Sequence, residues 1–331
     1  MKTRRNTIGL AFAACLGALG AAGPASAQAP LQDVLYLLPA PASLPAFAPW
    51  MIAKQRGYFA AEGLNVTFQV ARGGVDVAKQ VGAGNAVVGG AIGDTPILVR
   101  ANGVPVKAIA VLGGGSLMQL VVNKDKGVTS VKDLKGKTVT TLAFQDTTYF
   151  ALLGMLATVG LTKDDVNAQA AGPVNIWKLF AAGQADAMAS VPDWTFYALQ
   201  ANPKMNVDII PSDTVFKSMA QAIVASDDTI KKNPELLRKL VRATLKGMKA
   251  EMDDPAAAAA DFAKAVPENA GKEADLTEIF KGFAKYVYAG QQTLGEMNEQ
   301  RLSDLQDFYL KEKIIEQKTP VKDLYTNEFL K

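Results

Sequence analysis

Histidine is absent from this chain of 331 residues, and cysteine occurs once, at Cys15. Without histidine there is no Ser-His-Asp triad, no histidine general base and no histidine-ligated metal. A single cysteine excludes a disulfide within the chain. The hydrophobic fraction of 49% and the charged fraction of 20% are those of a folded protein with one or two domains. Any chemistry that this protein performs must therefore use other groups.

The N-terminal segment has the pattern of an export signal. Lys2, Arg4 and Arg5 precede an uncharged apolar stretch over residues 8–22, and Ala25-Ser26-Ala27 is a small-x-small cleavage pattern. We expect a signal peptide that is cut after Ala27. No later stretch approaches the roughly 20 uninterrupted apolar residues of a membrane-spanning helix.

The export route has alternatives. The adjacent Arg4 and Arg5 leave the twin-arginine route open, but Asn6-Thr7-Ile8 lacks the hydrophobic pair usual after them, which favours ordinary secretion. A lipoprotein would need cleavage just before Cys15, where the preceding hydrophobic run is short.

Net charge separates the leader from the rest of the chain. Lys and Arg number 35 and Asp and Glu 32, and the three excess positive charges are Lys2, Arg4 and Arg5, with no acid in residues 1–27. The mature protein is thus formally neutral. Because nucleic-acid binders carry a basic surplus on the folded domain, we expect no nucleic-acid partner.

From residue 33 onward, β-rich runs alternate with helical stretches, as in an α/β protein with mainly parallel sheets. A first series predicts strands at 34–38, 65–70, 86–92 and 106–112, with helices at 47–59, 75–81 and 96–101. A second series predicts strands at 117–123, 137–143, 167–171, 185–191 and 207–210, with helices at 149–159, 176–182 and 194–200. One more strand is expected at 218–225, and the chain is then predicted to be helical to its end.

This order predicts two similar lobes joined by two crossovers, with a helical C-terminal extension. Lobe I would contain residues 28–115 and 214–331, and lobe II residues 116–213. Ligands of open α/β sheets bind beyond the carboxyl ends of the strands, so we expect a cleft between the lobes. The turns that would face it are 43–50, 93–95, 113–116, 145–148 and 192–194. The charged faces of the tail, including Lys311-Glu312-Lys313, are expected to be solvated.

One continuous stretch carries a family resemblance. Residues 52–66 read Ile-Ala-Lys-Gln-Arg-Gly-Tyr-Phe-Ala-Ala-Glu-Gly-Leu-Asn-Val. This stretch resembles the signature AK-x-x-GYF-x-x-EGL-x-V of periplasmic substrate-binding proteins of ABC importers, in the NMT1-like branch for sulfonates, taurine, nitrate and thiamine-pyrimidine precursors. Further landmarks follow in family order at residues 73–74, 102–107, 120–122, 130–139, 183–187 and 232–236.

The resemblance implies a type II periplasmic-binding-protein fold, in which two Rossmann-like lobes close on a small ligand and then dock on a membrane permease with its ATPase. It also implies a periplasmic location and a monomer. Gly113-Gly114-Gly115-Ser116, at the first crossover, fits a flexible connection between the lobes. We expect no metal and no cofactor.

The candidate ligand-binding residues lie in or near the turns at the cleft. Thr147 and Thr148 could donate hydroxyl hydrogen bonds where the family is expected to bind its ligand, or Asp146 or Thr147 could simply cap the helix that follows. The full candidate set is Ser43, Pro45, Phe47, Trp50, Asp94, Thr95, Ser116, Asp146, Thr147, Thr148, Asn175, Asp193 and Trp194.

The side chains in these turns favour a ring over an anion. Asp94 and Asp146 would repel a ligand anion at a helix N-terminus, and Arg72 is the only nearby cation. Aromatic side chains are frequent around the turns, although most will belong to the core. We therefore expect a small aromatic or heteroaromatic ligand, pyrimidine-like, and keep alkanesulfonate, taurine or nitrate as the alternative.

Two other functional classes remain open. The resembling family includes a fungal branch of enzymes that makes the thiamine pyrimidine and consumes an active-site histidine, which this chain lacks. An enzyme based on paired carboxylates is conceivable, but Asp146 and Asp193 lie in no recognisable catalytic motif. A secreted sensor subunit that presents its liganded form to a membrane receptor would have the same sequence features.

Overall fold

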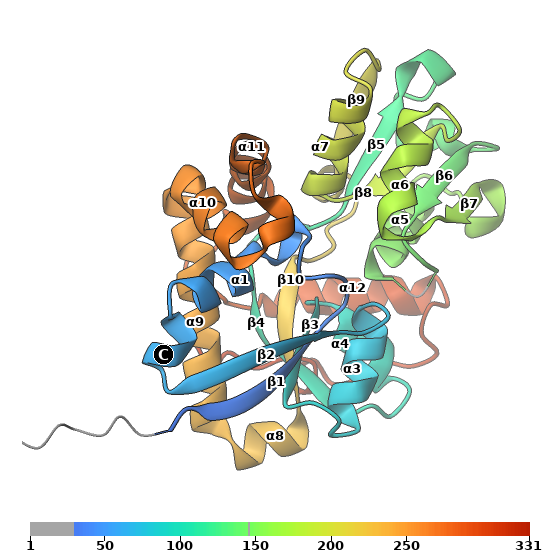
Figure 1. The fold of residues 1–331 in the computed structure, drawn as a ribbon. Helices are drawn as coiled ribbons and strands as arrows, with labels where there is room; N and C mark the ends of the chain where they lie inside the picture. Colours follow the sequence, from blue (N-terminus) through green and yellow to red (C-terminus); the bar gives the residue numbers. More distant parts are fainter. Residues whose placement is uncertain (1–29, 145) are drawn as a thin grey trace, which may run out of the picture. The chain divides into compact units, whose positions relative to one another are not determined.

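Strands of the chain form two separate five-stranded sheets, shown in Figure 1. This computed structural model describes residues 30–144 and 146–331. The expected signal peptide, its cleavage after Ala27 and Cys15 lie outside the described residues and stay predictions. Within the part that is described, no helix is both long and apolar enough to cross a membrane.

The first sheet has the strand order β2-β1-β3-β10-β4. Its central strand β3 reads Val-Gly-Gly-Ala-Ile and is buried along its whole length, as expected for a strand covered on both faces. β1 pairs in parallel with β2 and β3, whereas β10 pairs antiparallel with β3 and β4. The strands are β1 (Gln32–Leu38), β2 (Leu64–Val70), β3 (Val88–Ile92), β4 (Val106–Val111) and β10 (Gln221–Ser226).

The second sheet repeats this plan with the order β7-β6-β8-β5-β9. β6 is parallel to β7 and β8, and β5 is antiparallel to β8 and β9. The strands are β5 (Gln119–Asn123), β6 (Thr138–Thr141), β7 (Asn167–Ala170), β8 (Ala187–Ser190) and β9 (Val207–Pro211). The sheets are therefore mainly parallel, as predicted, but each is mixed. In each sheet the strand that enters from the other lobe runs antiparallel to its neighbours.

Helices follow the strands in both series, as the sequence pattern predicts. The expected single helix over 47–59 is interrupted, because Gly57 adopts a positive φ of 70° that ends one helix before the next begins. The helices of the first series are α1 (Ala48–Gln55), α2 (Tyr58–Ala61), α3 (Gly74–Gly82) and α4 (Thr95–Arg100), preceded by the 3₁₀ turn η1 (Pro45–Phe47). Those of the second are α5 (Thr147–Thr158), α6 (Gly172–Ala181) and α7 (Pro192–Ala201), after the 3₁₀ turn η3 (Val131–Leu134).

The C-terminal third packs helices on the first sheet's lobe. The stretch predicted to be helical contains the long helix α9, which begins at Pro234 and buries Leu237, Leu240 and Met248. The chain is not helical to its end, since residues 312–331 run in turns and bridges and Tyr325 pairs with Ala108 of β4. The elements are α8 (Asp227–Lys232), α9 (Pro234–Asp253), α10 (Pro255–Ala265), α11 (Glu273–Phe283), the π-helical turn η7 (Ala284–Tyr288) and α12 (Glu299–Lys311).

Two connections join the sheets: residues 112–118, the first crossover, and residues 212–220, the second crossover. They are hydrogen-bonded to each other, since the N–H of Leu117 donates to the carbonyl of Met219 at 3.1 Å. The predicted architecture of two α/β lobes, two crossovers and a helical C-terminal extension is confirmed. Residues 31–331 form one compact unit, so the exact lobe boundaries stay a prediction. Below, lobe I is the part built on the first sheet and lobe II the part built on the second.

Candidate functional site

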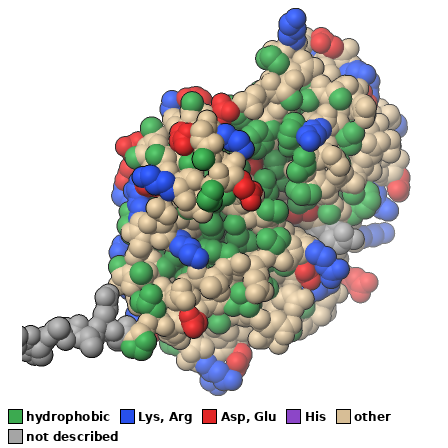
Figure 2. Space-filling model, viewed as in Figure 1, with side chains coloured by type: hydrophobic (Ala, Val, Ile, Leu, Met, Phe, Trp, Pro, Cys, Tyr) green, Lys and Arg blue, Asp and Glu red, His purple; other side chains and the backbone are tan. Residues whose placement is uncertain are grey.

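A small cavity of about 50 Å³ lies where the turns of both lobes meet. Lobe I contributes Phe47 of η1 and Gln221 of β10, and lobe II contributes Asp193 and Trp194 of α7. An outer cavity of about 370 Å³ adjoins it and shares Pro39, Ala40, Leu142 and Asp146 with it. Hydrophobic side chains, green in Figure 2, gather in the hollow between α10 and lobe II. The lining of the inner cavity is Pro39, Ala40, Leu44, Ala46, Phe47, Gly74, Ala91, Ile92, Leu117, Leu142, Asp146, Thr148, Val191, Asp193, Trp194 and Gln221.

Asp193 is the most unusual group in this lining. It lies in the first turn of α7, directly after Pro192, and is 0% exposed. Burial raises the pKa of its carboxyl from 3.8 to about 7, although backbone N–H groups of Asp193, Trp194 and Ala46 act in the opposite direction. These N–H groups stabilise the charge, but neither carboxylate oxygen makes a well-formed hydrogen bond within the described structure. A buried carboxyl without a partner is costly, which is typical of a group kept for a ligand.

Two more polar groups on the cavity are buried without a partner. The indole N–H of Trp194 has no acceptor, and Oε1 of Gln221 has no donor, among the described residues. Trp194 is next to Asp193 on α7, while Gln221 opens β10 from the opposite lobe. Together with Asp193 they provide two acceptor groups and one donor, in a lining whose other polar side chains are Asp146 and Thr148. A ligand with at least two N–H or O–H donors and one acceptor would complement them.

Asp146 and Thr148 also line this cavity, and both have a structural role at the start of α5. Asp146 caps α5 by accepting hydrogen bonds from the backbone N–H of Thr148, at 2.9 Å, and from the Thr148 hydroxyl. The capping interpretation of this turn is therefore confirmed, with Asp146 as the cap. The side chain of Thr147 lies outside the described residues.

The remaining sequence candidates lie away from this lining. Trp50 is in the core, where its ring centroid lies 5.9 Å from that of Tyr36. Asn175 is exposed on α6. Asp94 is buried and accepts a hydrogen bond from the Tyr309 hydroxyl, Thr95 accepts one from the N–H of Ile92, and Ser116 donates one to Asp213. Ser43 is bonded through its carbonyl to Asn269, and Pro45 is buried without lining the cavity.

Gln221 is the polar residue of the described cavity lining that sequence reasoning missed; the other missed lining residues are apolar or glycine. The sequence signal for Gln221 was a polar residue at the start of the otherwise apolar strand Gln-Ala-Ile-Val-Ala-Ser. Because β10 runs antiparallel to β3, the start of β10 lies at the edge of the sheet where the parallel strands end. Sequence reasoning looked for site residues only after strands and therefore passed over it. Arg72 lines only the outer cavity, and its side chain is 92% exposed beside Asp76. Among the residues that the structure describes, no lysine or arginine lines the inner cavity.

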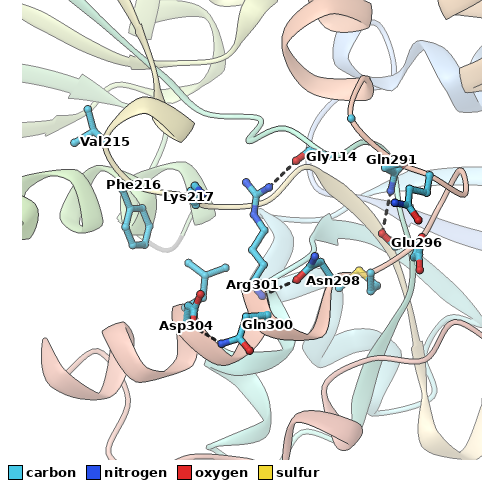
Figure 3. A pocket seen from close by; sticks show the side chains of 14 residues that line it. Gly114, Val215, Phe216, Lys217, Gln291, Glu296, Asn298, Gln300, Arg301 and Asp304 are labelled. Carbon is cyan, nitrogen blue, oxygen red and sulfur yellow. Dashed lines mark hydrogen bonds between the residues drawn. The ribbon is translucent and has the colours of Figure 1, made fainter.

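A larger cavity of about 730 Å³ is lined by both crossovers and the C-terminal segment. Figure 3 shows Arg301 there, pointing to the carbonyl of Gly114, and Gln300 bonded to Asp304. Its side chains mostly bond to one another or to backbone. The inner cavity is therefore the candidate ligand site, because unpartnered buried groups from both lobes line it. Among the described residues, no group of three acidic, cysteine or histidine side chains could hold a metal ion.

Comparisons with known proteins find a family and relatives that this chain resembles. A family model described as NMT1/THI5 like matches residues 44–258. The chain is 26% identical to the riboflavin-binding protein RibY of Chloroflexus aurantiacus, over 100% of this chain and 98% of that protein. It is also 26% identical to the 4-amino-5-hydroxymethyl-2-methylpyrimidine phosphate synthase of Aspergillus parasiticus, over 67% of this chain and 68% of the relative.

The fold is shared with a solved structure of low sequence identity. The alkanesulfonate-binding protein SsuA of Xanthomonas axonopodis pv. citri, bound to MOPS, superposes with a TM-score of 0.71 and 16% identity, over 91% of this chain and 100% of that one. This likeness shows the architecture, and the named relatives include both binding proteins and enzymes. The family match over most of the chain, together with the two-lobed fold of periplasmic binding proteins, shows that this chain belongs to the NMT1/THI5-like family.

Proposed function

We propose that this protein is the periplasmic solute-binding component of an ABC uptake system, and that its cleft holds a planar heteroaromatic solute. The observation that carries the ligand class is the set of three buried, unpartnered groups on Asp193, Trp194 and Gln221. A nitrogen heterocycle whose edge presents two N–H donors and one acceptor matches them. Phe47 and the Trp194 ring supply apolar contact surface for its faces.

The size of the site supports a ligand that extends beyond the inner cavity. At about 50 Å³ the inner cavity is small, but with the adjoining cavity of about 370 Å³ it comes into the range of roughly 300–1,000 Å³ usual for small-molecule sites. We infer that the donor-bearing edge of the ring enters the inner cavity and that the rest of the solute occupies the outer one. The names of two relatives, a riboflavin-binding protein and a pyrimidine phosphate synthase, point to the same ring chemistry.

An anion of the alkanesulfonate or nitrate type is the weaker candidate. Two carboxyls, Asp146 and Asp193, line the inner cavity, and its lining among residues 30–144 and 146–331 contains no lysine or arginine. A bound anion would therefore be repelled unless both carboxyls were protonated.

The ligand class is tested by native mass spectrometry of the protein purified from its own periplasm, followed by calorimetry with riboflavin, an aminopyrimidine, taurine and nitrate. We expect a bound ring compound, one per chain, recovered chemically unchanged. Trp194→Phe keeps an aromatic ring but removes the indole donor, so it should weaken binding at least tenfold. Tight binding of taurine or nitrate with none of either ring compound would refute the ligand class.

The transport role has its own test. Deletion of the gene should abolish uptake of the compound that mass spectrometry identifies, and the wild-type chain should restore uptake. Fractionation should place the mature protein in the periplasm with an N-terminus at Gln28. Conversion of the compound to a product by the purified protein would instead favour an enzyme.

A further inference from the structure

The side chain of Arg301, on α12, joins both crossovers. Its Nη1 donates to the carbonyl of Gly114, in the first crossover, at 2.6 Å, and its Nη2 donates to the carbonyl of Ser218, in the second. Figure 3 shows the guanidinium reaching up from α12 to Gly114. These two residues are far apart in sequence and belong to different connections, so one guanidinium holds both of them to the same helix.

A carboxylate completes this cluster. Arg301 Nη2 also donates to Oδ1 of Asp213, at 2.6 Å, and to the hydroxyl oxygen of Ser116, at 3.0 Å. Asp213 in turn accepts from the backbone N–H of Ser116 at 2.8 Å and from the Ser116 hydroxyl at 2.6 Å. The Arg301 and Asp213 side chains are 18% and 33% exposed. The ion pair is thus partly sheltered from solvent, where charge-assisted hydrogen bonds are stronger than at an open surface.

Two aromatic residues of α12 connect the same helix to each lobe. The Tyr309 hydroxyl donates to Asp94, next to α4 of lobe I, at 2.6 Å. The Phe308 ring packs on Phe216 of the second crossover with ring centroids 4.6 Å apart. Phe216 in turn packs so tightly on Gly154 of α5, in lobe II, that a Cβ there would lie 2.4 Å from the ring. α12 therefore contacts lobe I directly and lobe II through the second crossover.

Besides its contact with Arg301, the first crossover is held to the C-terminal segment by backbone hydrogen bonds. The N–H groups of Gly114 and Gly115 donate to the carbonyls of Ala289 and Val287, at 3.0 and 2.9 Å. A Cβ on Gly115 would lie 2.1 Å from the carbonyl oxygen of Tyr286, so this backbone contact needs glycine. Backbone hydrogen bonds thus hold the first crossover to the C-terminal segment, and Arg301 brings the second crossover into the same assembly.

We propose that Arg301 is a positioning residue for ligand binding, which holds the two crossovers as a single pivot about which the lobes close. The guanidinium has five N–H donors in a rigid fork, so it can retain two carbonyls and a carboxylate while the crossovers bend. A pivot that is ordered before binding reduces the conformational entropy lost when the lobes close. The inference rests on the proposed solute-binding function, because it assigns Arg301 a role in the closing movement.

The pivot is tested without any ligand, by measuring distances between spin labels on the two lobes. The full chain carries Cys15→Ser, and nitroxide labels are attached at Lys79→Cys on α3 and Gln169→Cys on β7, two exposed positions. Pulsed electron paramagnetic resonance then gives the distribution of distances between lobes. We expect Arg301→Met to broaden this distribution at least twofold and Arg301→Lys to give an intermediate width, since lysine keeps the charge but lacks the fork.

The matched control is Arg242→Met. Arg242 makes a bidentate ion pair with Glu62, at 2.7 and 2.6 Å, but both residues belong to lobe I. This variant should keep the wild-type width even if its melting temperature falls as far as that of Arg301→Met. Equal widths for wild type and both Arg301 variants would overturn the proposal.

A second variant keeps the test decisive if Arg301→Met does not fold. Asp213→Asn preserves the shape of the partner and removes its charge, so we expect a broader distribution than in wild type. Its control is Asp261→Asn, which breaks the Arg56–Asp261 pair of 2.7 Å within lobe I. An unchanged width in Asp213→Asn would likewise reject the pivot. No solute is present in these measurements. Their result therefore tests the pivot independently of whether the proposed ligand binds at the inner cavity.

Discussion

The hydroxyl of Tyr309 on α12 donates a hydrogen bond of 2.6 Å to Oδ2 of Asp94, in the turn between β3 and α4. Both side chains are buried, and Oδ1 of Asp94 has no partner among the described residues. Burial raises the pKa of the Asp94 carboxyl from 3.8 to about 6, and the Tyr309 hydrogen bond acts in the opposite direction. This phenol is therefore the main support of a buried negative charge at neutral pH.

Tyr309→Phe should destabilise the protein more at pH 8 than at pH 5. The folded-state pKa of Asp94 lies above its unfolded value, so its contribution to stability is present at low pH and is lost as pH rises from about 4 to 6. Loss of the phenol raises that pKa further and costs about 1–3 kcal/mol where Asp94 is charged. Urea unfolding of wild type and Tyr309→Phe at pH 5 and pH 8 measures this difference in the free energy of unfolding. Tyr325→Phe, which loses a 3.1 Å exposed bond to Glu299, should change little at either pH.

Asp193→Asn should make the folded protein more stable at high pH. In wild type, the neutral carboxyl is favoured inside the fold, so stability declines as pH rises from about 4 to about 7. The amide of Asn carries no charge at any pH. Between pH 4 and pH 7 the free energy of unfolding of the variant should therefore rise relative to that of wild type, by up to about 4 kcal/mol. The exposed Asp208→Asn serves as control and should run parallel to wild type. A constant difference between Asp193→Asn and wild type from pH 4 to 8 would contradict the burial of an ionisable Asp193.

Gln221→Leu should stabilise the empty protein and weaken solute binding. The variant removes a buried carbonyl oxygen that has no donor, so we expect a gain of about 1 kcal/mol in the free energy of unfolding. Gln119 is the matched control, because it opens β5 as Gln221 opens β10 and is equally buried, but accepts a 3.0 Å hydrogen bond from Thr195. Gln119→Leu should destabilise. If both variants destabilise equally in urea unfolding, Gln221 is an ordinary structural residue.

Gly247→Ala should destabilise the protein although alanine is the better helix former. A Cβ at Gly247, inside α9, would lie 2.0 Å from the carbonyl oxygen of Pro49 at the start of α1. The backbone would have to move to relieve this overlap, which should lower the free energy of unfolding by about 1–3 kcal/mol. The higher helix propensity of alanine offsets only about 1 kcal/mol of that loss. Gly282, inside α11, is the control, since its Cβ would meet only Pro192 at 3.8 Å. Thermal unfolding should show Gly282→Ala unchanged or more stable than wild type.

Much of the fold was predictable because its signals are local. Alternating strand and helix patterns identified most strands and α-helices up to β10 to within a few residues, whereas the helices after β10 were predicted only as one helical stretch. Gly57 shows the limit of that approach, since only its positive φ decides that one predicted helix becomes two. The non-helical end after Lys311 was missed because it is held by partners distant in sequence, such as β4 at Ala108.

The candidate site was predicted in part. Phe47, Asp146, Thr148, Asp193 and Trp194 line the inner cavity, as their place in turns after strands suggested. Gln221 was missed because its access to the cavity depends on the antiparallel direction of β10. The expectation of a solvated tail suits Lys311, which is 78% exposed, but not Arg301, at 18%. A charged residue on a helix looks the same in sequence whether it faces water or a crossover.

By itself, the sequence determined the two-lobed α/β class, the formal neutrality of residues 28–331 and the absence of histidine chemistry, because composition and periodicity are properties of the chain alone. Only the tertiary structure decided which polar groups are buried without partners and which side chain joins the crossovers. Both depend on contacts between residues far apart in sequence, such as Arg301 with Gly114, and on the solvent that those contacts exclude.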